Sequence, residues 1–228
     1  MKIYRIFPII LQALIWIPCR LFFKFFVRIH IEGTENLRLV SGGPLLFASN
    51  HVSELDAVFI RSCLPFFWKG SGMFYVSRPP EFYKKGFGWR KYFYGGVIFK
   101  IWGAYPAYPG THIYHESLRD IEEILKDGNS VTIFPEGKRS FDGVIHEARG
   151  GVSYLSYSVP CPIVPTRIKG FENATLKSLL SRKHSVTVVY GKPIFPQELF
   201  GNSTPVVNNT INNFREASVR VVERIHSL

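Results

Sequence analysis

Short apolar runs alternate with longer segments in which apolar residues recur every three or four positions, from about residue 44 to the end of the chain. The short runs suit buried strands, and the wider spacing predicts helices. Strands are expected at 44–50, 72–77, 130–135, 162–170 and 185–194. Helices are expected at 54–64, 87–102, 111–128, 151–158 and 208–228. The alternation predicts an α/β fold, a single domain with a largely parallel central sheet flanked by helices.

The N-terminal segment is strongly apolar and carries cations but no acid. Its charge-free stretch, 6–19, is shorter than the roughly 20 residues that a transmembrane helix needs, and Pro8 and Pro18 stand near its two ends. No small-residue cleavage site follows it, as a signal peptide would require. We expect one helix, or two helices broken near Pro18, lying in the membrane interface; a buried core helix is the alternative. Residues 1–28 then form the membrane-attachment segment and 29–228 the domain.

The composition narrows the choice of partner. The 228 residues suffice for one domain, 46% are hydrophobic, and the net charge is +11, which calls for an anionic partner. No zinc finger, RNP1 motif or basic heptad region is present, so a membrane phospholipid surface is favoured and nucleic acid is not expected. Three cysteines lack metal-ligand spacing and indicate reduced thiols. We expect a monotopic protein on the cytoplasmic face of a membrane.

The stretch "NHVSELD" (50–56) places a histidine and an aspartate five residues apart. On one continuous helix His51 and Asp56 would lie about 140° apart and could not touch. If Ser53 is the N-cap, Asp56 falls at N3 of a capping box and His51 lies in the preceding loop, which can fold back over the helix start. Asp56 can then accept the Nδ1 proton, leaving Nε2 to take a proton from a substrate hydroxyl. The alternative is that Asp56 only caps a helix.

The stretch "FPEGKRS" (134–140) begins at the end of the strand expected at 130–135. It therefore lies at the carboxyl end of a parallel sheet, where ligands of open α/β folds bind. Lys138 and Arg139 are adjacent cations, and Gly137 lets backbone N–H groups approach closely, which together can cradle a phosphate. The five positions of interest are Glu136, Gly137, Lys138, Arg139 and Ser140. The alternative is a turn with solvated charges.

Together these blocks resemble the glycerolipid acyltransferases of the lysophosphatidic acid acyltransferase (PlsC-like) type. "NHVSELD" is similar to that family's NHxSxxD form, "FPEGKRS" to its FPEGTRS block and "VPCPIVPTRI" (159–168) to its late proline block, over roughly residues 30 to 195. The resemblance implies that His51 is the general base and Asp56 its partner. It also implies that 136–140 bind the acceptor and that the N-terminal segment attaches to a membrane.

The implied reaction moves a fatty acyl group from acyl-CoA or acyl carrier protein to the hydroxyl of a lysophospholipid acceptor. The foremost acceptor is 1-acyl-glycerol-3-phosphate, which gives phosphatidic acid, with no cofactor and no metal. The alternatives are a different lysolipid or aminolipid acceptor, or a non-catalytic membrane-binding scaffold. One departure bears on the acceptor: in "GAYPAYPG" (103–110), Tyr108 stands about where the family has an arginine that holds the acceptor phosphate. A phosphate contact is then lost, or is supplied by Lys138 or another base; we expect Arg139 and Lys138 to hold the headgroup.

Overall fold

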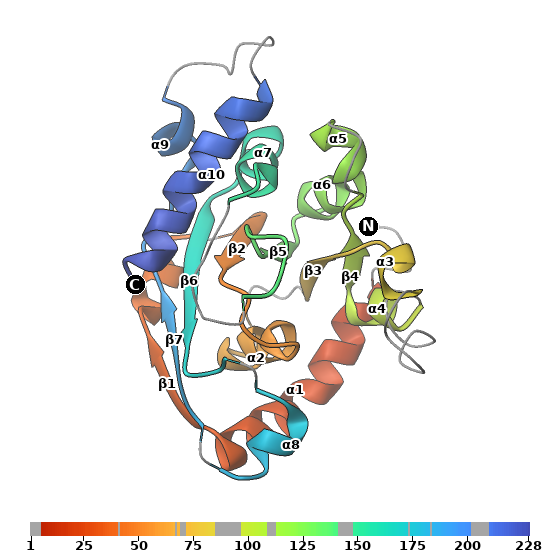
Figure 1. The fold of residues 1–228 in the computed structure, drawn as a ribbon, viewed down its shortest axis with the longest axis vertical. Coiled ribbons are helices and arrows are strands. Elements are labelled where there is room, and N and C mark those ends of the chain that lie inside the picture. The colour runs from red at the N-terminus through yellow and green to blue at the C-terminus, as the bar shows by residue number, and fades with distance from the viewer. Residues whose placement is uncertain are drawn as a thin grey trace.

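The computed structural model describes residues 6–40, 42–66, 68, 72–84, 97–108, 113–140, 148–172, 174–182, 184–201 and 210–228. Within them runs a seven-stranded sheet in the order β1-β7-β6-β2-β5-β3-β4 (Figure 1). The strands are β1 Arg28–Glu32, β2 Leu45–Ser49, β3 Met73–Ser77, β4 Ala104–Pro106, β5 Ser130–Ile133, β6 Ile163–Lys169 and β7 Ser185–Tyr190. Neighbouring strands pair in parallel except β6 with β7, which are antiparallel. The predicted α/β domain with a largely parallel sheet is confirmed.

Burial explains why the central strands read as uninterrupted apolar runs. Every residue of β2 and of β5 is buried, because helices cover both faces of a parallel sheet. Successive residues of β2 point to opposite faces, so Leu46 belongs to one hydrophobic core and Phe47 to the other. The edge strand β1 instead alternates exposed and half-buried positions and was not predicted.

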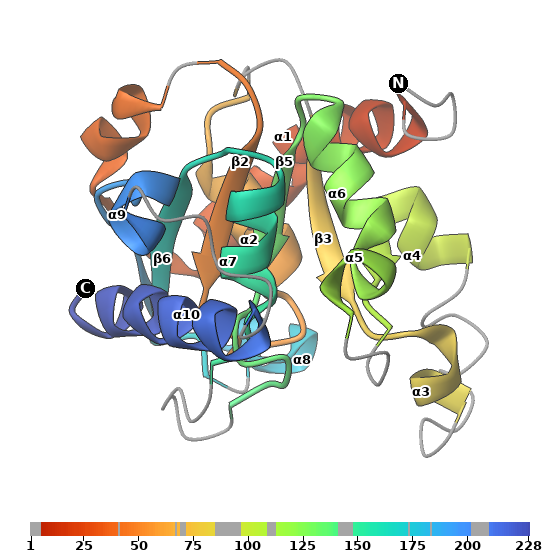
Figure 2. The ribbon, with the colours of Figure 1, turned by 90° about the horizontal axis from the view of Figure 1, so that it is seen from above.

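The helices form a layer on each face of the sheet (Figure 2). One core is closed by α1 Ile6–Phe26, the 3-10 helix η2 Thr34–Leu39, α2 Asp56–Cys63 and α8 Leu176–Leu179. The other is closed by α6 Arg119–Lys126, α7 Gly151–Ser158, α9 Pro196–Phe200 and α10 Thr210–His226. The short helices α3 Pro80–Lys84, α4 Val97–Trp102 and α5 Tyr114–Ser117 lie toward the β4 edge. The chain therefore folds into three layers, helices on sheet on helices.

Helix α1 is continuous through Pro18 and extends past Arg20, whose guanidinium donates to the carbonyl of Ser62 at 2.6 Å. It is long and apolar enough to cross a membrane by length and composition, and 17% of its most apolar 18-residue window is buried. So little burial does not fit the alternative of a core helix. Its inward side is fastened by Gln12, whose amide donates to the Met73 carbonyl at 2.7 Å and accepts from the Met73 N–H at 2.9 Å.

The outward side of α1 carries apolar residues at helical spacing. They are exposed large side chains: Ile6, Phe7, Ile10, Leu14, Ile17, Leu21 and Phe25. We call this set the α1 stripe. The helix is thus docked on one side and exposes an apolar surface on the other. The boundary between 1–28 and 29–228 stays a prediction.

Several expected helices differ in extent from the structure. The helix expected at 111–128 is divided at Leu118, which separates α5 from α6 with φ −117° and ψ 15°. Of the helix expected at 87–102, α4 covers 97–102, and 85–96 lie outside the described residues. Of the helix expected at 208–228, α10 covers Thr210–His226, and 202–209 lie outside the described residues.

Candidate active site

The motifs that stood apart in the sequence meet at the carboxyl ends of β2 and β5, which pair in parallel at the centre of the sheet. His51 follows β2 by two residues, and Glu136 follows β5 by three. Arg78 directly follows β3, the other neighbour of β5. The carboxyl edge of parallel strands is where open α/β sheets bind ligands, so this edge is the candidate site.

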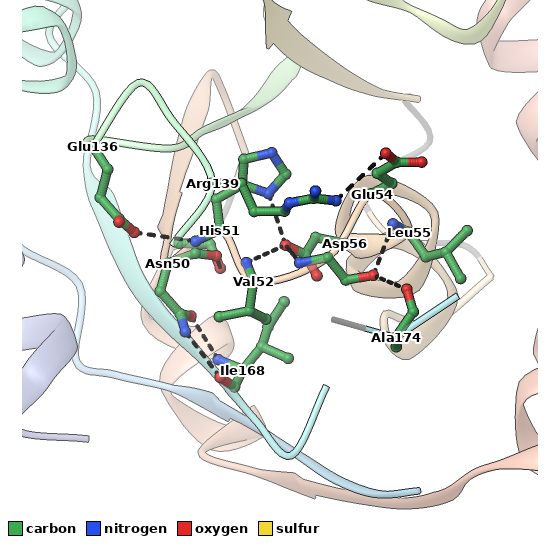
Figure 3. Close-up of polar contacts among 12 residues, drawn as sticks. Asn50, His51, Val52, Glu54, Leu55, Asp56, Glu136, Arg139, Ile168 and Ala174 are labelled. Carbon is green, nitrogen blue, oxygen red and sulfur yellow. Dashed lines mark hydrogen bonds and ion pairs between the residues drawn. The ribbon is translucent and has the colours of Figure 1, made fainter. Parts of the chain in front are cut away.

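The imidazole of His51 is held by the carboxylate of Asp56 (Figure 3). The Nδ1 of His51 lies 2.8 Å from Oδ2 of Asp56. The same oxygen accepts the backbone N–H groups of Val52 at 2.8 Å and Ser53 at 2.9 Å. The side chain of His51 is 27% exposed, whereas that of Asp56 is fully buried. Because the carboxylate accepts at Nδ1, the neutral imidazole carries its proton there and presents Nε2 as a base.

The capping box expected around Ser53 forms only in part: Asp56 accepts the Ser53 N–H, but Ser53 is not the N-cap. Helix α2 begins at Asp56, and Leu55 occupies its N-cap without a side-chain cap bond. The hydroxyl of Ser53 donates to the carbonyl of Ala174 at 2.8 Å and accepts the N–H of Leu55 at 3.2 Å. Ser53 therefore ties the His51 loop to the chain before α8, and Asp56 holds the loop through the N–H groups of Val52 and Ser53.

Burial raises the pKa of Asp56, because the carboxylate loses its hydration, and the hydrogen bonds from His51, Ser53 and Val52 oppose that rise. A buried carboxylate that has lost its hydration is stabilised when a positive charge forms beside it. A proton taken up at Nε2 would create such a charge on the imidazole. Asp56 is thus placed to stabilise an imidazolium.

Two residues that the sequence analysis did not single out position His51. The ring of Phe134 stacks on the imidazole, with ring centroids 4.1 Å apart and an interplanar angle of 18°. The amide of Asn50 donates to the Ile168 carbonyl at 2.9 Å and accepts the Ile168 N–H at 2.8 Å, which joins the end of β2 to β6. Asn50 and Phe134 are the first residues of the two recognised stretches, 50–56 and 134–140, and that position was the available signal.

Glu136 and Ser140 hold the backbone of His51 from two directions. The buried Glu136 accepts the N–H of His51 at Oε1, 3.2 Å away. The N–H of Ser140 donates to the carbonyl of His51 at 2.8 Å. Glu136 therefore contacts the His51 loop, and its membership of the acceptor-binding block, which the resemblance implies, stays a prediction.

Gly137 makes the turn that follows Glu136. Its φ of +65° lies in the left-handed region, and a Cβ there would meet Cδ and Nε of Arg149 at 2.8 Å, so both backbone and space favour glycine. The guanidinium of Arg78 donates to the carbonyl of Gly137 at 2.7 Å and lies 4.3 Å from the ring centroid of Phe82. Two arginines thus converge on this turn.

The two cations predicted for the headgroup lie beside the same turn. Lys138 is exposed, and Arg139 is half-buried with NH1 3.4 Å from Oε1 of Glu54. Arg78 and Arg149 form no ion pair with a carboxylate within the part of the chain that the structure describes. The sequence offered a signal for Arg78, which directly follows the strand expected at 72–77. It offered no signal for Arg149.

Tyr108 follows β4, and its backbone is bonded to Ser117 through the Tyr108 N–H at 3.1 Å and the Tyr108 carbonyl at 2.6 Å. Its side chain is exposed. Within the described residues no group of three or more His, Cys, Asp or Glu is arranged to hold a metal ion. The candidate chemistry is that of His51 and Asp56 beside a set of cations.

Comparison with known proteins agrees with this geometry. Residues 28–169 match the family model described as Acyltransferase. The chain is 31% identical over 145 residues to a chloroplastic 1-acyl-sn-glycerol-3-phosphate acyltransferase of Arabidopsis thaliana, covering 64% of this chain and 37% of the relative. A Brassica napus protein of the same description is 28% identical over 172 residues, covering 75% and 46%. The chain thus spans less than half the length of these two relatives.

Two further likenesses complete the comparison. The N-acylphosphatidylethanolamine synthase of Arabidopsis thaliana is 31% identical over 170 residues, covering 67% of this chain and 56% of the relative. The crystal structure of the 1-acyl-sn-glycerophosphate acyltransferase PlsC from Thermotoga maritima superposes with a TM-score of 0.58 at 20% identity, covering 94% of this chain and 80% of that one. At that identity the likeness shows a shared fold.

Proposed function

The chain belongs to the acyltransferase family, and we propose that it transfers a fatty acyl group from a thioester to the hydroxyl of 1-acyl-glycerol-3-phosphate, forming phosphatidic acid. The observation that carries this proposal is the 2.8 Å contact between Nδ1 of His51 and the buried Asp56, which leaves Nε2 as a base on a part-exposed imidazole. The relatives described as 1-acyl-sn-glycerol-3-phosphate acyltransferases support the choice of acceptor.

In the proposed reaction Nε2 of His51 takes the proton of the lipid hydroxyl as its oxygen attacks the thioester carbonyl. The tetrahedral intermediate then collapses, the carbon–sulfur bond breaks, and the leaving thiolate takes the proton from the imidazolium. The products are an ester and a free thiol, and no covalent enzyme intermediate, cofactor or metal is needed. Asp56 orients the imidazole and offsets its transient positive charge.

Positive charge around the Gly137 turn supports an anionic acceptor. Lys138 and Arg139 were predicted to hold the headgroup, and Arg78 and Arg149 reach the same turn from β3 and from the chain before α7. An arginine in this set can pair with a phosphate through two parallel hydrogen bonds. We propose that these side chains replace the arginine that Tyr108 does not supply.

We further propose that the protein is monotopic, with the α1 stripe in the interface and the domain on the cytoplasmic side. The stripe supplies the apolar face, while Gln12 and Arg20 fasten the opposite side to the domain. The cysteines Cys19, Cys63 and Cys161 are free thiols, as expected in a reducing compartment. Acyl-CoA and acyl carrier protein are the two candidate donors.

The test is a transfer assay with the purified full-length chain, using labelled acyl-CoA and acyl carrier protein against a panel of acceptors. Transfer to 1-acyl-glycerol-3-phosphate above the other acceptors, lost in His51→Ala, is the expected result. The N-acylphosphatidylethanolamine synthase relative makes an aminolipid the second candidate, so phosphatidylethanolamine and zwitterionic lysolipids belong in the panel. Absence of transfer to every acceptor would favour a scaffold that keeps the fold.

A further inference from the structure

The described residues 171–172, 174–182 and 184, which include α8, lie against the C-terminal end of α1 (Figure 1). Phe171 and Leu179 face inward and are buried. The ring of Phe171 stacks on Phe59 of α2 with centroids 4.5 Å apart and lies 6.3 Å from the ring of Phe23 in α1. This inner side fixes α8 beside the end of α1 through the hydrophobic core.

The outer side of the segment continues the α1 stripe. Leu180 is 56% exposed, and Phe25 of α1 is 60% exposed. The guanidinium of Arg182 lies 3.6 Å from the centroid of the Phe25 ring, and 5.6 Å from that of Phe26. A cation over an exposed aromatic ring, with an exposed leucine in the same segment, combines positive charge with apolar surface, as a membrane interface requires.

Arg182 also has an unusual backbone. Its φ of +54° makes it the non-glycine residue with positive φ within the described part of the chain. This conformation costs a residue with a Cβ some free energy, so the turn that carries Arg182 is maintained by its surroundings. The backbone therefore holds the guanidinium over Phe25 of the α1 stripe in a conformation that costs free energy.

Further cations lie on α1, on α8 and at the start of β1. Lys24 and Lys177 are exposed, and Arg28 is exposed next to the turn, since its N–H donates to the carbonyl of His184 at 3.0 Å. The nearest acid of the segment, Glu172, accepts the N–H of Gly170 at 3.2 Å. The end of α1, the start of β1, α8 and the turn that follows it (180–182, called the α8 turn) thus present four cations within the described residues, beside exposed apolar side chains. This combination complements an anionic bilayer surface.

We propose that the α8 turn and the end of α1 bind the phosphate of an anionic phospholipid in the bilayer, with Arg182 as the central contact. Phe25 and Leu180 enter the apolar side of the interface, while the guanidinium pairs with the phosphate. This inference rests on the membrane attachment proposed above and adds a second attachment point outside the N-terminal segment.

The same segment reaches the candidate active site. Ala174, just before α8, accepts the hydroxyl of Ser53, which belongs to the His51 loop, at 2.8 Å (Figure 3). A lipid held at the α8 turn therefore anchors a segment that is directly bonded to that loop. The α8 turn sets how the His51 loop faces the bilayer from which the acceptor lipid comes.

The experiment measures binding of the full-length protein to vesicles by co-sedimentation, with phosphatidylcholine alone and with added phosphatidylglycerol. Arg182→Asn removes the charge but tolerates positive φ, and Arg220→Gln on the exposed surface of α10 removes one charge from the opposite face of the sheet. We expect Arg182→Asn to weaken binding to the anionic vesicles about fivefold. Binding to neutral vesicles, and the Arg220→Gln variant, should stay near wild type.

A second variant tests the apolar half of the proposal. Leu180→Ser should weaken binding to both kinds of vesicle, because it removes apolar area instead of charge. Equal effects of Arg182→Asn and Arg220→Gln, or no effect of Arg182→Asn, would overturn the proposal. Transfer to a lysolipid in detergent micelles reports the proposed function separately: its loss in His51→Ala with undiminished vesicle binding reports the chemistry, whereas loss of vesicle binding in Arg182→Asn reports the attachment.

Discussion

The backbone N–H of His51 donates to Oε1 of Glu136, 85 residues later in the chain, across 3.2 Å. The acceptor oxygen belongs to a buried side chain. The contact joins the two motifs at the ends of β2 and β5 and identifies Glu136 as a residue that positions the His51 loop. Its loss should therefore affect the rate of the chemical step more than binding of the acceptor.

Glu136→Ala should lower kcat about tenfold or more, because an unsatisfied buried N–H costs roughly 1 to 3 kcal/mol and lets the His51 loop move. Glu136→Gln keeps an oxygen acceptor and should retain more of the activity. Steady-state kinetics with varied acceptor measures both variants. A raised acceptor KM at unchanged kcat would instead place Glu136 against the acceptor.

His51→Ala should reduce transfer by about 10² to 10⁴, the usual contribution of a positioned general base, without loss of fold. Asp56→Asn keeps the shape of the side chain but offers the imidazole an amide in place of a carboxylate, and should also lower kcat. Transfer rates and near-ultraviolet circular dichroism are measured together. Full activity of His51→Ala in folded protein contradicts the proposed chemistry.

Arg78→Ala and Arg139→Ala should each raise the acceptor KM about tenfold, since a charge-assisted hydrogen bond contributes roughly 1.5 to 3 kcal/mol. The donor KM and the KM for a neutral lysolipid should change little, which is the internal control. Tyr108→Arg supplies a further check. If it improves use of 1-acyl-glycerol-3-phosphate while the native enzyme prefers a neutral acceptor, the acceptor assignment is wrong.

Leu14→Lys combined with Ile17→Lys should release much of the protein from membranes, because both residues lie on the exposed α1 stripe. High salt alone should release only part of the native protein, since screening leaves apolar burial in place. Fractionation with a thermal melt measures attachment and fold together. Deleting residues 1–28 is a poorer test, because it also removes the hydrogen bonds of Gln12 to Met73. Undiminished pelleting of the folded double variant would assign attachment to another surface.

Stability should fall in alkaline solution through two buried thiols. Burial raises the pKa of Cys63 from 9.0 to about 12 and likewise that of Cys161 from 9.0 to about 12. The unfolded chain ionises near pH 9 while the folded chain keeps its protons, so this contribution is present below pH 9 and is lost as the pH rises toward 12. The loss is about 1.4 kcal/mol per pH unit for each thiol.

Urea unfolding at pH 8 and pH 10 measures this loss. The double variant Cys63→Ala with Cys161→Ala should lose less of its free energy of unfolding between the two pH values than the native chain does. If the free energy of unfolding fell equally in the native chain and the double variant, other groups, such as the buried tyrosines Tyr75 and Tyr190, would govern alkaline stability.

Local patterns in the sequence were sufficient for the central strands, for α2 and α7, and for the apolar character of α1. Burial on both faces forces a continuous apolar run, and that run can be read without knowing its neighbours. The spacing of His51 and Asp56 allowed their contact without requiring it, and the resemblance to the acyltransferases supplied the expectation that the two residues work together. The break at Leu118 escaped the pattern, since the apolar spacing of 111–128 continues across it, although α5 has no buried residue and α6 buries one face.

Only the tertiary structure decided what surrounds His51 and Asp56. The parallel pairing of β2 with β5 turned Glu136 toward His51, and the adjoining β3 brought Arg78 to Gly137. The reversal of β7 against β6 carried the chain back to β1, and Arg182 came to lie over Phe25. Periodicity reports which side of an element is buried, but it carries no information about which distant element covers that side, because pairing and register depend on the packing of the whole sheet.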